Sequence, residues 1–448
     1  MDIHKIIEET KKIDKEYNYF NLISEDLALG QSKELDTEPR GRLNGTMVSV
    51  KDCICVAGIE SRAGSKILTG YKPVFDATVV EKVKQEGGII IGKTSQDAFG
   101  FGSFSVNSDF KIPLNPFDKQ RVCGGSSGGA AGFTQKASFQ HIALAQSTGG
   151  SIVAPASFCG VVGLCPTYGR VSRYGLIDYA NSLDKIGPIG KNVQDVALML
   201  SIISGFDKRE STTINAKVPS YVDYVSKEIK NLKIGIIKEG FGDGVEKDVI
   251  EKVEEGISKL EVNGAKTKGV SLPLTEKYGV ACYYLIAMSE ASTNLAKLCG
   301  MRYGKHEKLE GNFNEYFSKV RSLNFNEESK RRILLGTFAR MAGYRDAYYI
   351  RAMKVRTKII EEYKRAFKGF DVLVSPTMPI VAPRFDEIQR LTPLQNYMID
   401  ILTVGPNLAG LPHINIPVGF NTDKMPVGLM LIADHLKEET LIQAGAKI

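Results

Sequence analysis

The chain has 448 residues, of which 43% are hydrophobic and 24% are charged, and its formal net charge is +7. This composition is that of a globular protein with a sizeable core, and it excludes a disordered or fibrous chain. The length suits one large α/β domain or two ordinary ones. The basic excess, 58 Lys and Arg against 51 Asp and Glu, is mild and does not indicate a nucleic-acid-binding groove.

Three further features bear on location. The first 17 residues are charged and have no apolar core, so we expect no secretory signal there. No apolar run approaches the roughly 18 residues that a membrane span needs. The seven cysteines are scattered without a CxxC pair, which argues against a disulfide framework or a zinc ribbon. We therefore expect a cytoplasmic protein with reduced thiols and no membrane association.

In the first half of the chain, short apolar runs alternate with helical patterns, and glycine clusters lie between them. The segment that follows the first helix is polar as far as Arg42 and predicts no regular element. The predicted elements are a helix over 1–20, a strand over 47–50 that ends at Lys51, a helix over 76–88, a strand over 89–91, a helix near 130–137, a strand over 141–145 and a helix over 193–203.

The second half continues this alternation after a polar stretch over 206–230. Its predicted elements are strands over 232–239, 370–379, 413–420 and 427–433, and helices over 248–260, 275–298, 328–367, 393–408 and 438–448. Strands alternating with helices predict an α/β fold, with a central sheet covered by helices on both faces.

Two motifs resemble known catalytic signatures, but their context argues against both. Gly87–Thr94 fits the phosphate-binding pattern GxxxxGK[ST]; however, a helix precedes it, and its loop positions are three isoleucines that predict a strand. Gly125–Gly129 fits GxSxG, whose serine needs a histidine base later in the chain. The best candidate, His413, lies in a predicted strand and is better explained as a packed residue.

A lysine and two serine-bearing glycine turns remain. Lys51 follows an apolar strand, and burial there would lower its pKa and let it act as a base. The TGGS turn offers unobstructed backbone amides for an oxyanion, from Thr148, Gly149 and Gly150. Ser151 is therefore the better nucleophile, and Ser126 the better proton relay to Lys51. The residues alone also allow that Lys51 is a solvated surface lysine and that both turns are only tight corners.

The same residues resemble the catalytic region of the amidase signature family. The stretches that carry the resemblance are VSVKDC, GGSSGG, STGGS and PASFCGVVGLCPTYGRVS. The resemblance implies a serine–serine–lysine triad of Ser151, Ser126 and Lys51, with a cis peptide before Ser126. It assigns Ser127 as a supporting hydroxyl. It also implies one α/β catalytic domain over 1–448 with a mixed sheet between helices, a core of about 43–200 and a substrate-clamp region of about 230–448.

Further stretches, including YGLIDYANSLDKIGPI and DILTVGPNLAGLP, resemble the family's glutaminase subunits of tRNA-dependent amidotransferases. In those, a Tyr, an Arg and an Asp hold glutamine. They match Tyr283, Arg332 and Asp400, although Tyr284 and Arg331 are alternatives for the first two. Arginine suits the α-carboxylate of glutamine, and aspartate its α-ammonium group.

This resemblance also implies partners. The chain would release ammonia from glutamine and supply it to a B subunit, which uses ATP and Mg²⁺ to amidate Glu-tRNA or Asp-tRNA, and a small C subunit would complete a heterotrimer. The chain itself would hold no cofactor and no metal, and would bind tRNA mainly through the B subunit. The alternative within the family is a stand-alone amidase for small or lipid amides. A non-catalytic scaffold is the alternative of another class.

Two positions depart from the family pattern. The usual Asp before TGGS is Ser147, and the usual Arg in GGSIR is Val153. Losing only one partner of a buried ion pair strands a charge, whereas losing both can be nearly neutral. We therefore expect a repacked site that still works.

Overall fold

The computed structural model describes residues 2–448 and is built around one sheet. The strands are β1 (Phe20–Ile23), β2 (Met47–Lys51), β3 (Ile89–Thr94), β4 (His141–Ser147), β5 (Val162–Cys165), β6 (Lys185–Gly190), β7 (Lys233–Ile237), β8 (Lys266–Val270), β9 (Val372–Pro376), β10 (His413–Phe420) and β11 (Pro426–Ala433). They lie in the order β1-β3-β2-β4-β6-β5-β10-β11-β9-β7-β8. Parallel and antiparallel pairs both occur, so the sheet is mixed, as predicted.

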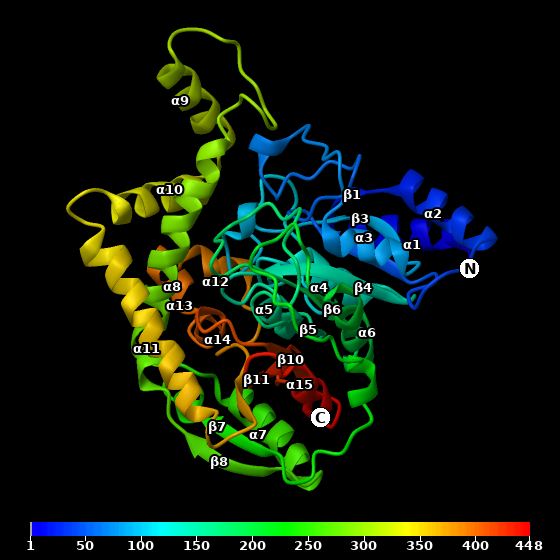
Figure 1. Cartoon of the computed structure of the whole chain (residues 1–448), viewed down its shortest axis with the longest axis vertical. Coiled ribbons are helices and arrows are strands. Elements are labelled where there is room, and N and C mark those ends of the chain that lie inside the picture. Colours follow the sequence, from blue (N-terminus) through cyan, green and yellow to red (C-terminus); the bar gives the residue numbers. More distant parts are fainter. Residues whose placement is uncertain (1) are drawn as a thin grey trace.

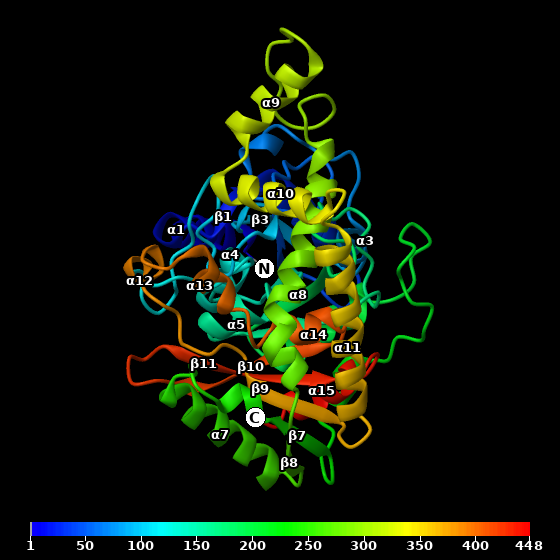
Figure 2. The ribbon, with the colours of Figure 1, turned by 90° about the vertical axis from the view of Figure 1, so that its left-hand side faces the viewer.

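Helices cover the sheet on both faces (Figure 1, Figure 2). They are α1 (Ile3–Tyr17), α2 (Glu25–Thr37), α3 (Thr78–Gln85), α4 (Gly128–Lys136), α5 (Val153–Phe158), α6 (Val193–Ile203), α7 (Lys247–Val262), α8 (Pro273–Asn294), α9 (Phe313–Asn324), α10 (Glu327–Arg340), α11 (Arg351–Ala366), α12 (Phe385–Gln389), α13 (Pro393–Met398), α14 (Val404–Leu408) and α15 (Glu438–Gly445). Every residue of β2, β3 and β4 is buried, as expected for strands covered on both sides.

The two ends of the molecule differ in architecture. Helix α9 projects at one end, and β7 and β8 lie at the other (Figures 1 and 2). The long helices α8, α10 and α11 form one side of the molecule, where α8 packs against both of the others. These three helices come from the second half of the chain, and two of them contact loops of the first half: Tyr283 of α8 packs on Gly149, and Arg332 of α10 donates to Tyr179.

The structure corrects two predicted helices. The helix expected over 328–367 is divided into α10, a π-helical turn η6 (Asp346–Ile350) and α11. Gly343 has a φ of 86°, a left-handed conformation that ends regular helix. The helix expected over 393–408 is also divided, and residues 399–403 between α13 and α14 are not α-helical. Pro406 lacks an amide hydrogen and fits the first turn of a new helix, so α14 begins here.

Several short elements were not predicted. The polar stretch to Arg42 contains β1 and α2, and the second half contains β8 and α9. Strands β5 and β6 read VGLC and KIGPIG, whose glycines and proline hide the strand pattern. These strands depend on their neighbours for their hydrogen bonds, because β6 pairs with both β4 and β5.

Candidate active site

The first feature of the site is a buried lysine at the end of β2, a central strand between β3 and β4. Lys51 is fully buried, and its Nζ donates to Ser126 Oγ at 2.7 Å and to the backbone oxygen of Gln146 at 2.8 Å. Burial lowers the pKa of Lys51 to about 8, while the nearby Cys53, Asp97 and Asp184 oppose that shift. A lysine with this pKa is partly neutral near pH 8, as a general base must be.

The GGSSGG turn lies directly before α4, and its serines are fully buried. The peptide between Gly125 and Ser126 is cis. The glycines are required by close packing: a Cβ on Gly125 would lie 2.4 Å from Asp97 Oδ2, and one on Gly129 would lie 2.5 Å from the backbone oxygen of Tyr19. The turn is therefore part of the packed core rather than a flexible linker. Ser127 Oγ donates to the Gln146 backbone oxygen at 3.2 Å, the same oxygen that Lys51 contacts.

The second glycine turn connects β4 to α5 and carries Ser151, which is 7% exposed. A Cβ on Gly149 would lie 2.4 Å from the ring of Tyr283, so this glycine allows the tyrosine to approach the turn. Thr148 Oγ1 donates to Asp184 Oδ1 at 2.6 Å and anchors the start of the turn. Ser147 stabilises the far end of the turn, because its Oγ accepts a hydrogen bond from the Gly150 amide at 3.2 Å.

Ser147 and Val153, the two departures from the family pattern, are both fully buried. Lys185 on β6 is paired with Ser147 across the two strands, and its Nζ donates to the Leu411 backbone oxygen at 3.2 Å. Burial lowers the pKa of Lys185. Position 147 thus faces a buried lysine, while position 153 contributes an apolar side chain to α5.

Ser151 lines a small cavity of about 10 Å³. The other residues lining it are Gly100, Gly102, Ser103, Gly149, Gly150, Tyr283, Tyr284, Arg332 and Asp400. This volume holds about one water molecule, so an amino-acid substrate requires the surrounding side chains to move. The cavity nevertheless brings a serine, an arginine and an aspartate, Ser151, Arg332 and Asp400, to one place.

Of the two adjacent arginines, Arg332 is the one that lines this cavity. It is 2% exposed, and it donates from Nε to Glu328 Oε1 at 2.7 Å and from Nη1 to Tyr179 at 2.6 Å. These two bonds leave the Nη2 group of the guanidinium for another acceptor. The side chain of Arg331 is 41% exposed and pairs with Glu328 on the outer side of α10.

Both tyrosines of the Tyr283–Tyr284 pair line the cavity, but they differ in their contacts. Tyr283 packs on Gly149, whereas Tyr284 donates to Asp400 Oδ2 at 2.7 Å. Asp400 also accepts from Ser103 Oγ at 2.9 Å, and burial raises its pKa to about 6. Asp400 lies in the non-helical segment between α13 and α14, so the break in the predicted helix places this carboxylate at the site.

Reasoning from sequence alone missed several residues of this site. Gln146 contacts Lys51 through both its backbone and its side chain, and Asp184 is bonded to Gln146 and Thr148. The only available signals were positional: Gln146 adjoins the STGGS stretch, and Asp184 lies within YGLIDYANSLDKIGPI. Nothing in either stretch indicated a contact with Lys51.

The rejected P-loop-like segment is part of the buried sheet. Lys93 of the P-loop-like segment is buried at the end of β3, and its Nζ donates to Ser61 Oγ at 2.9 Å. Within residues 2–448 we find no group of three or more His, Cys, Asp or Glu side chains that could hold a metal ion. No helix in the same part of the chain is both long and apolar enough to cross a membrane.

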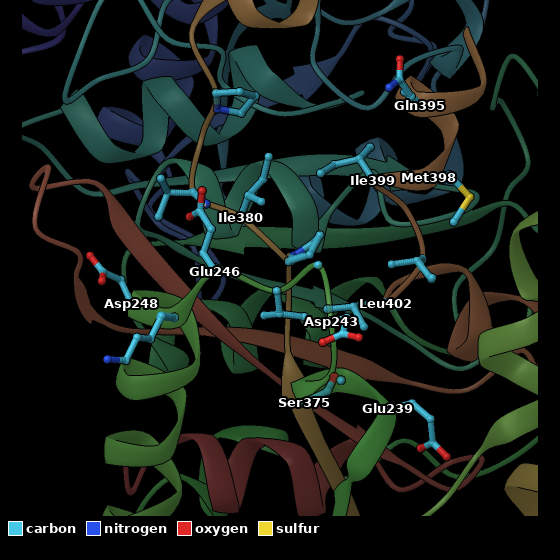
Figure 3. Close-up of a pocket in the computed structure, with 18 of the residues that line it drawn as sticks. Glu239, Asp243, Glu246, Asp248, Ser375, Ile380, Gln395, Met398, Ile399 and Leu402 are labelled. Atoms are coloured by element: carbon cyan, nitrogen blue, oxygen red, sulfur yellow. The ribbon is translucent and has the colours of Figure 1, made fainter. Parts of the chain in front are cut away.

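The segment that carries Asp400 also lines a much larger cavity, of about 870 Å³ (Figure 3). Ile399 and Leu402 of this segment line it together with acidic residues such as Glu239, Asp243 and Glu246. The triad residues do not line this cavity. Size alone would select it as the active site, but the buried base and the nucleophile select the smaller one.

Comparison with known proteins shows the family of this chain. The family model described as Amidase matches residues 3–442. The chain belongs to the amidase family. It is 46% identical over 434 residues to the A subunit of glutamyl-tRNA(Gln) amidotransferase from Clostridium botulinum, covering 96% of this chain and 89% of the relative. The A subunit from Methanococcoides burtonii is 47% identical over 421 residues, covering 94% and 87%.

Solved structures of the amidase family share the fold. The crystal structure of the A subunit of glutamyl-tRNA(Gln) amidotransferase from Thermotoga maritima superposes with a TM-score of 0.82 at 37% identity. The match covers 98% of this chain and 89% of that one. A 6-aminohexanoate cyclic dimer hydrolase has a TM-score of 0.85 at 20% identity, which shows the shared amidase fold alone.

Proposed function

We propose that this chain is the glutamine-hydrolysing subunit of a tRNA-dependent amidotransferase. The observation that carries the proposal is the 2.7 Å contact between the buried Lys51 and Ser126, beside a cavity that Ser151, Arg332 and Asp400 line together. The relatives named as A subunits of such an enzyme, at 46–47% identity over most of the chain, support the substrate assignment.

In this proposal Ser151 Oγ attacks the side-chain carbonyl carbon of glutamine. The Ser151 proton passes to Ser126, and the Ser126 proton passes to the neutral Lys51. The amides of the Thr148–Ser151 turn stabilise the oxyanion, and the Gly150 amide must exchange its bond with Ser147 to take part. The proton returns to the leaving nitrogen, ammonia departs, and water hydrolyses the glutamyl ester.

Arg332 and Asp400 would hold the α-carboxylate and the α-ammonium group of glutamine, and Tyr283 or Tyr284 would line the side chain. The opposite charges of the two clamp residues match a zwitterionic amino acid, which a simple aryl or lipid amide is not. The cavity must widen beyond about 10 Å³ for glutamine to enter. Movement of the 399–403 segment or of α10 would provide this space.

The remaining parts of the proposal concern the partners. Ammonia would be passed in the cytoplasm to a B subunit that uses ATP and Mg²⁺ to amidate Glu-tRNA, Asp-tRNA or both, and a small C subunit would complete the heterotrimer. The names of the relatives support a complex with several subunits and Glu-tRNA(Gln) as a substrate. This chain would contribute glutamine hydrolysis and no cofactor.

The test is ammonia release from glutamine by the chain, with and without the co-expressed B and C subunits. Ser151→Ala should abolish the release, whereas Ser258→Ala, at an exposed serine of α7, should leave it unchanged. Release that rises with partners and charged tRNA is the expected result. Turnover of simple amides with no release from glutamine would instead establish a stand-alone amidase.

A further inference from the structure

The side chain of Gln146 contacts Lys51, but the proposed mechanism gives it no role. It lies near the end of β4 and is 2% exposed. Its Oε1 accepts from Lys51 Nζ at 3.1 Å, and its Nε2 donates to Asp184 Oδ1 at 3.0 Å and to Thr148 Oγ1 at 2.8 Å. The amine at one end and the carboxylate at the other fix the orientation of this amide.

Asp184 holds Gln146 in place from the far side. This carboxylate is 1% exposed, and its Oδ2 accepts from the amides of Tyr179 and Ala180 at 2.8 and 2.9 Å. Its Oδ1 accepts from Gln146 and Thr148. Burial raises the pKa of Asp184 to about 7, and these hydrogen bonds oppose that shift. Asp184 therefore orients both Gln146, which contacts Lys51, and Thr148, where the second glycine turn begins.

The arrangement matters because of the geometry of a neutral amine, which has two N–H bonds and one lone pair. Gln146 supplies two acceptors to Lys51 Nζ, its backbone oxygen at 2.8 Å and its Oε1 at 3.1 Å. If both N–H bonds are directed to Gln146, the lone pair is left for the third neighbour, Ser126 Oγ at 2.7 Å. That is the direction from which Lys51 must receive a proton.

We propose that Gln146, held by Asp184, is a positioning residue that aims the Lys51 lone pair at Ser126. The inference rests on the proposed function, in which Lys51 is the base of the triad. Gln146 is neutral, whereas Asp97 and Asp184 act on Lys51 through their charge. Loss of the Gln146 side chain should therefore disturb the direction of proton transfer, and should also remove an acceptor that favours the charged amine.

The experiment measures labelling of Ser151 by phenylmethylsulfonyl fluoride, which needs the base but not glutamine recognition. Ser151 Oγ forms a bond to sulfur, the S–F bond breaks, fluoride leaves, and the serine proton passes through Ser126 to Lys51. The rate is followed by intact mass from pH 6 to 10 on the full-length chain, and the modified residue is identified by peptide mapping.

Gln146→Met has nearly the same volume and removes the acceptor. We expect its labelling rate at high pH to fall at least about tenfold, with the acid limb of the profile shifted to lower pH. The matched control is Gln96→Met, a fully buried glutamine whose Oε1 accepts from the Cys53 amide and does not contact Lys51. The Gln96→Met control should keep both the wild-type labelling rate and the wild-type position of the acid limb in the pH profile.

Gln146→Asn provides a second variant if the methionine variant does not fold, because it keeps an amide but is one methylene too short to reach Lys51. A wild-type profile in a folded Gln146 variant would overturn the positioning role. An equal loss of labelling rate in Gln96→Met would also overturn the positioning role, because any change in the core would then be enough to slow the labelling. Absence of Ser151 labelling in the wild-type chain would instead overturn the nucleophile assignment in the proposed function.

Discussion

At the scale of single residues, the chemistry depends on how burial changes two ordinary side chains. Lys51 and Ser126 are both fully buried, and they are 2.7 Å apart although 75 residues separate them in sequence. Desolvation destabilises the protonated form of the lysine, so the amine becomes neutral at a lower pH and can act as a base. In water the same lysine would stay protonated at neutral pH, and the serine would stay unreactive.

The pH dependence of glutamine hydrolysis follows from this pKa. Only neutral Lys51 can accept the serine proton, so activity should rise as pH passes through the pKa of about 8. Between pH 7 and pH 9 the neutral fraction grows about tenfold, and kcat should grow by about the same factor. Steady-state kinetics across this range, with Lys51→Met as the inactive control, test the prediction. A rate that is constant from pH 6 to 9 would contradict it.

The clamp gives a prediction about substrate affinity. Asp400→Asn and Arg332→Met should each raise KM for glutamine about 10- to 100-fold, because each removes a charged partner of the zwitterion. Arg331→Met is the matched control, since this arginine is partly exposed and does not line the cavity. Equal KM values in all three variants would exclude a clamp built from these residues.

At the scale of elements, the position of α10 relative to α8 determines where Arg332 lies. The two helices approach closely at Gly336, one turn after Arg332 in α10. A Cβ on Gly336 would lie 1.9 Å from the backbone oxygen of Met288 in α8. The glycine therefore sets the distance between the helices, and no larger residue fits without a shift of the backbone.

Gly336→Ala should displace α10 and raise KM for glutamine several-fold, because the guanidinium moves with the helix. Labelling of Ser151 by a sulfonyl fluoride should not change, since the triad lies on β2 and on the turns before α4 and α5. Gly30→Ala in α2 is the control: no atom lies within 4 Å of its Cβ, and alanine favours helix there. A loss of labelling in Gly336→Ala would show that α10 supports the triad as well as the clamp.

At the scale of the whole molecule, the single sheet ties the two halves of the chain together. β10 pairs with β5 and β11 pairs with β9, so strands from residues 413–433 join the catalytic part of the sheet to β9, β7 and β8. The residues of the proposed substrate clamp belong to the second half, and those of the proposed triad to the first. Their meeting at one cavity requires both halves to be folded.

We therefore expect one cooperative unfolding transition for the chain, as the single-domain prediction requires. Amide exchange in β2 and in β9 should be lost at the same denaturant concentration, and near-ultraviolet circular dichroism of the tyrosines should give the same midpoint. A separate, earlier loss of protection in β9 would indicate two units and contradict the single-domain prediction.

The sequence by itself determined much of the sheet, and it predicted which side chains react. β2, β3, β4, β10 and β11 were all predicted, because each is a short apolar run whose pattern lies within the segment itself. The two glycine turns were predicted to be catalytic, with Lys51 as a base, Ser126 as a relay and Ser151 as a nucleophile, and these assignments stay predictions. The family resemblance supplied the clamp, but not which of two neighbouring arginines faces the substrate.

Only the tertiary structure decided how these groups meet. The short strands β5 and β6 exist because their neighbours supply hydrogen bonds, and the helix over 393–408 is interrupted where Asp400 reaches the site. The pKa of Lys51 and its two contacts with Gln146, 95 residues away, arise from burial that no local pattern records. The local spacing of apolar residues indicates which helix or strand a segment can form. Desolvation and long-range contacts arise only when the whole chain is folded.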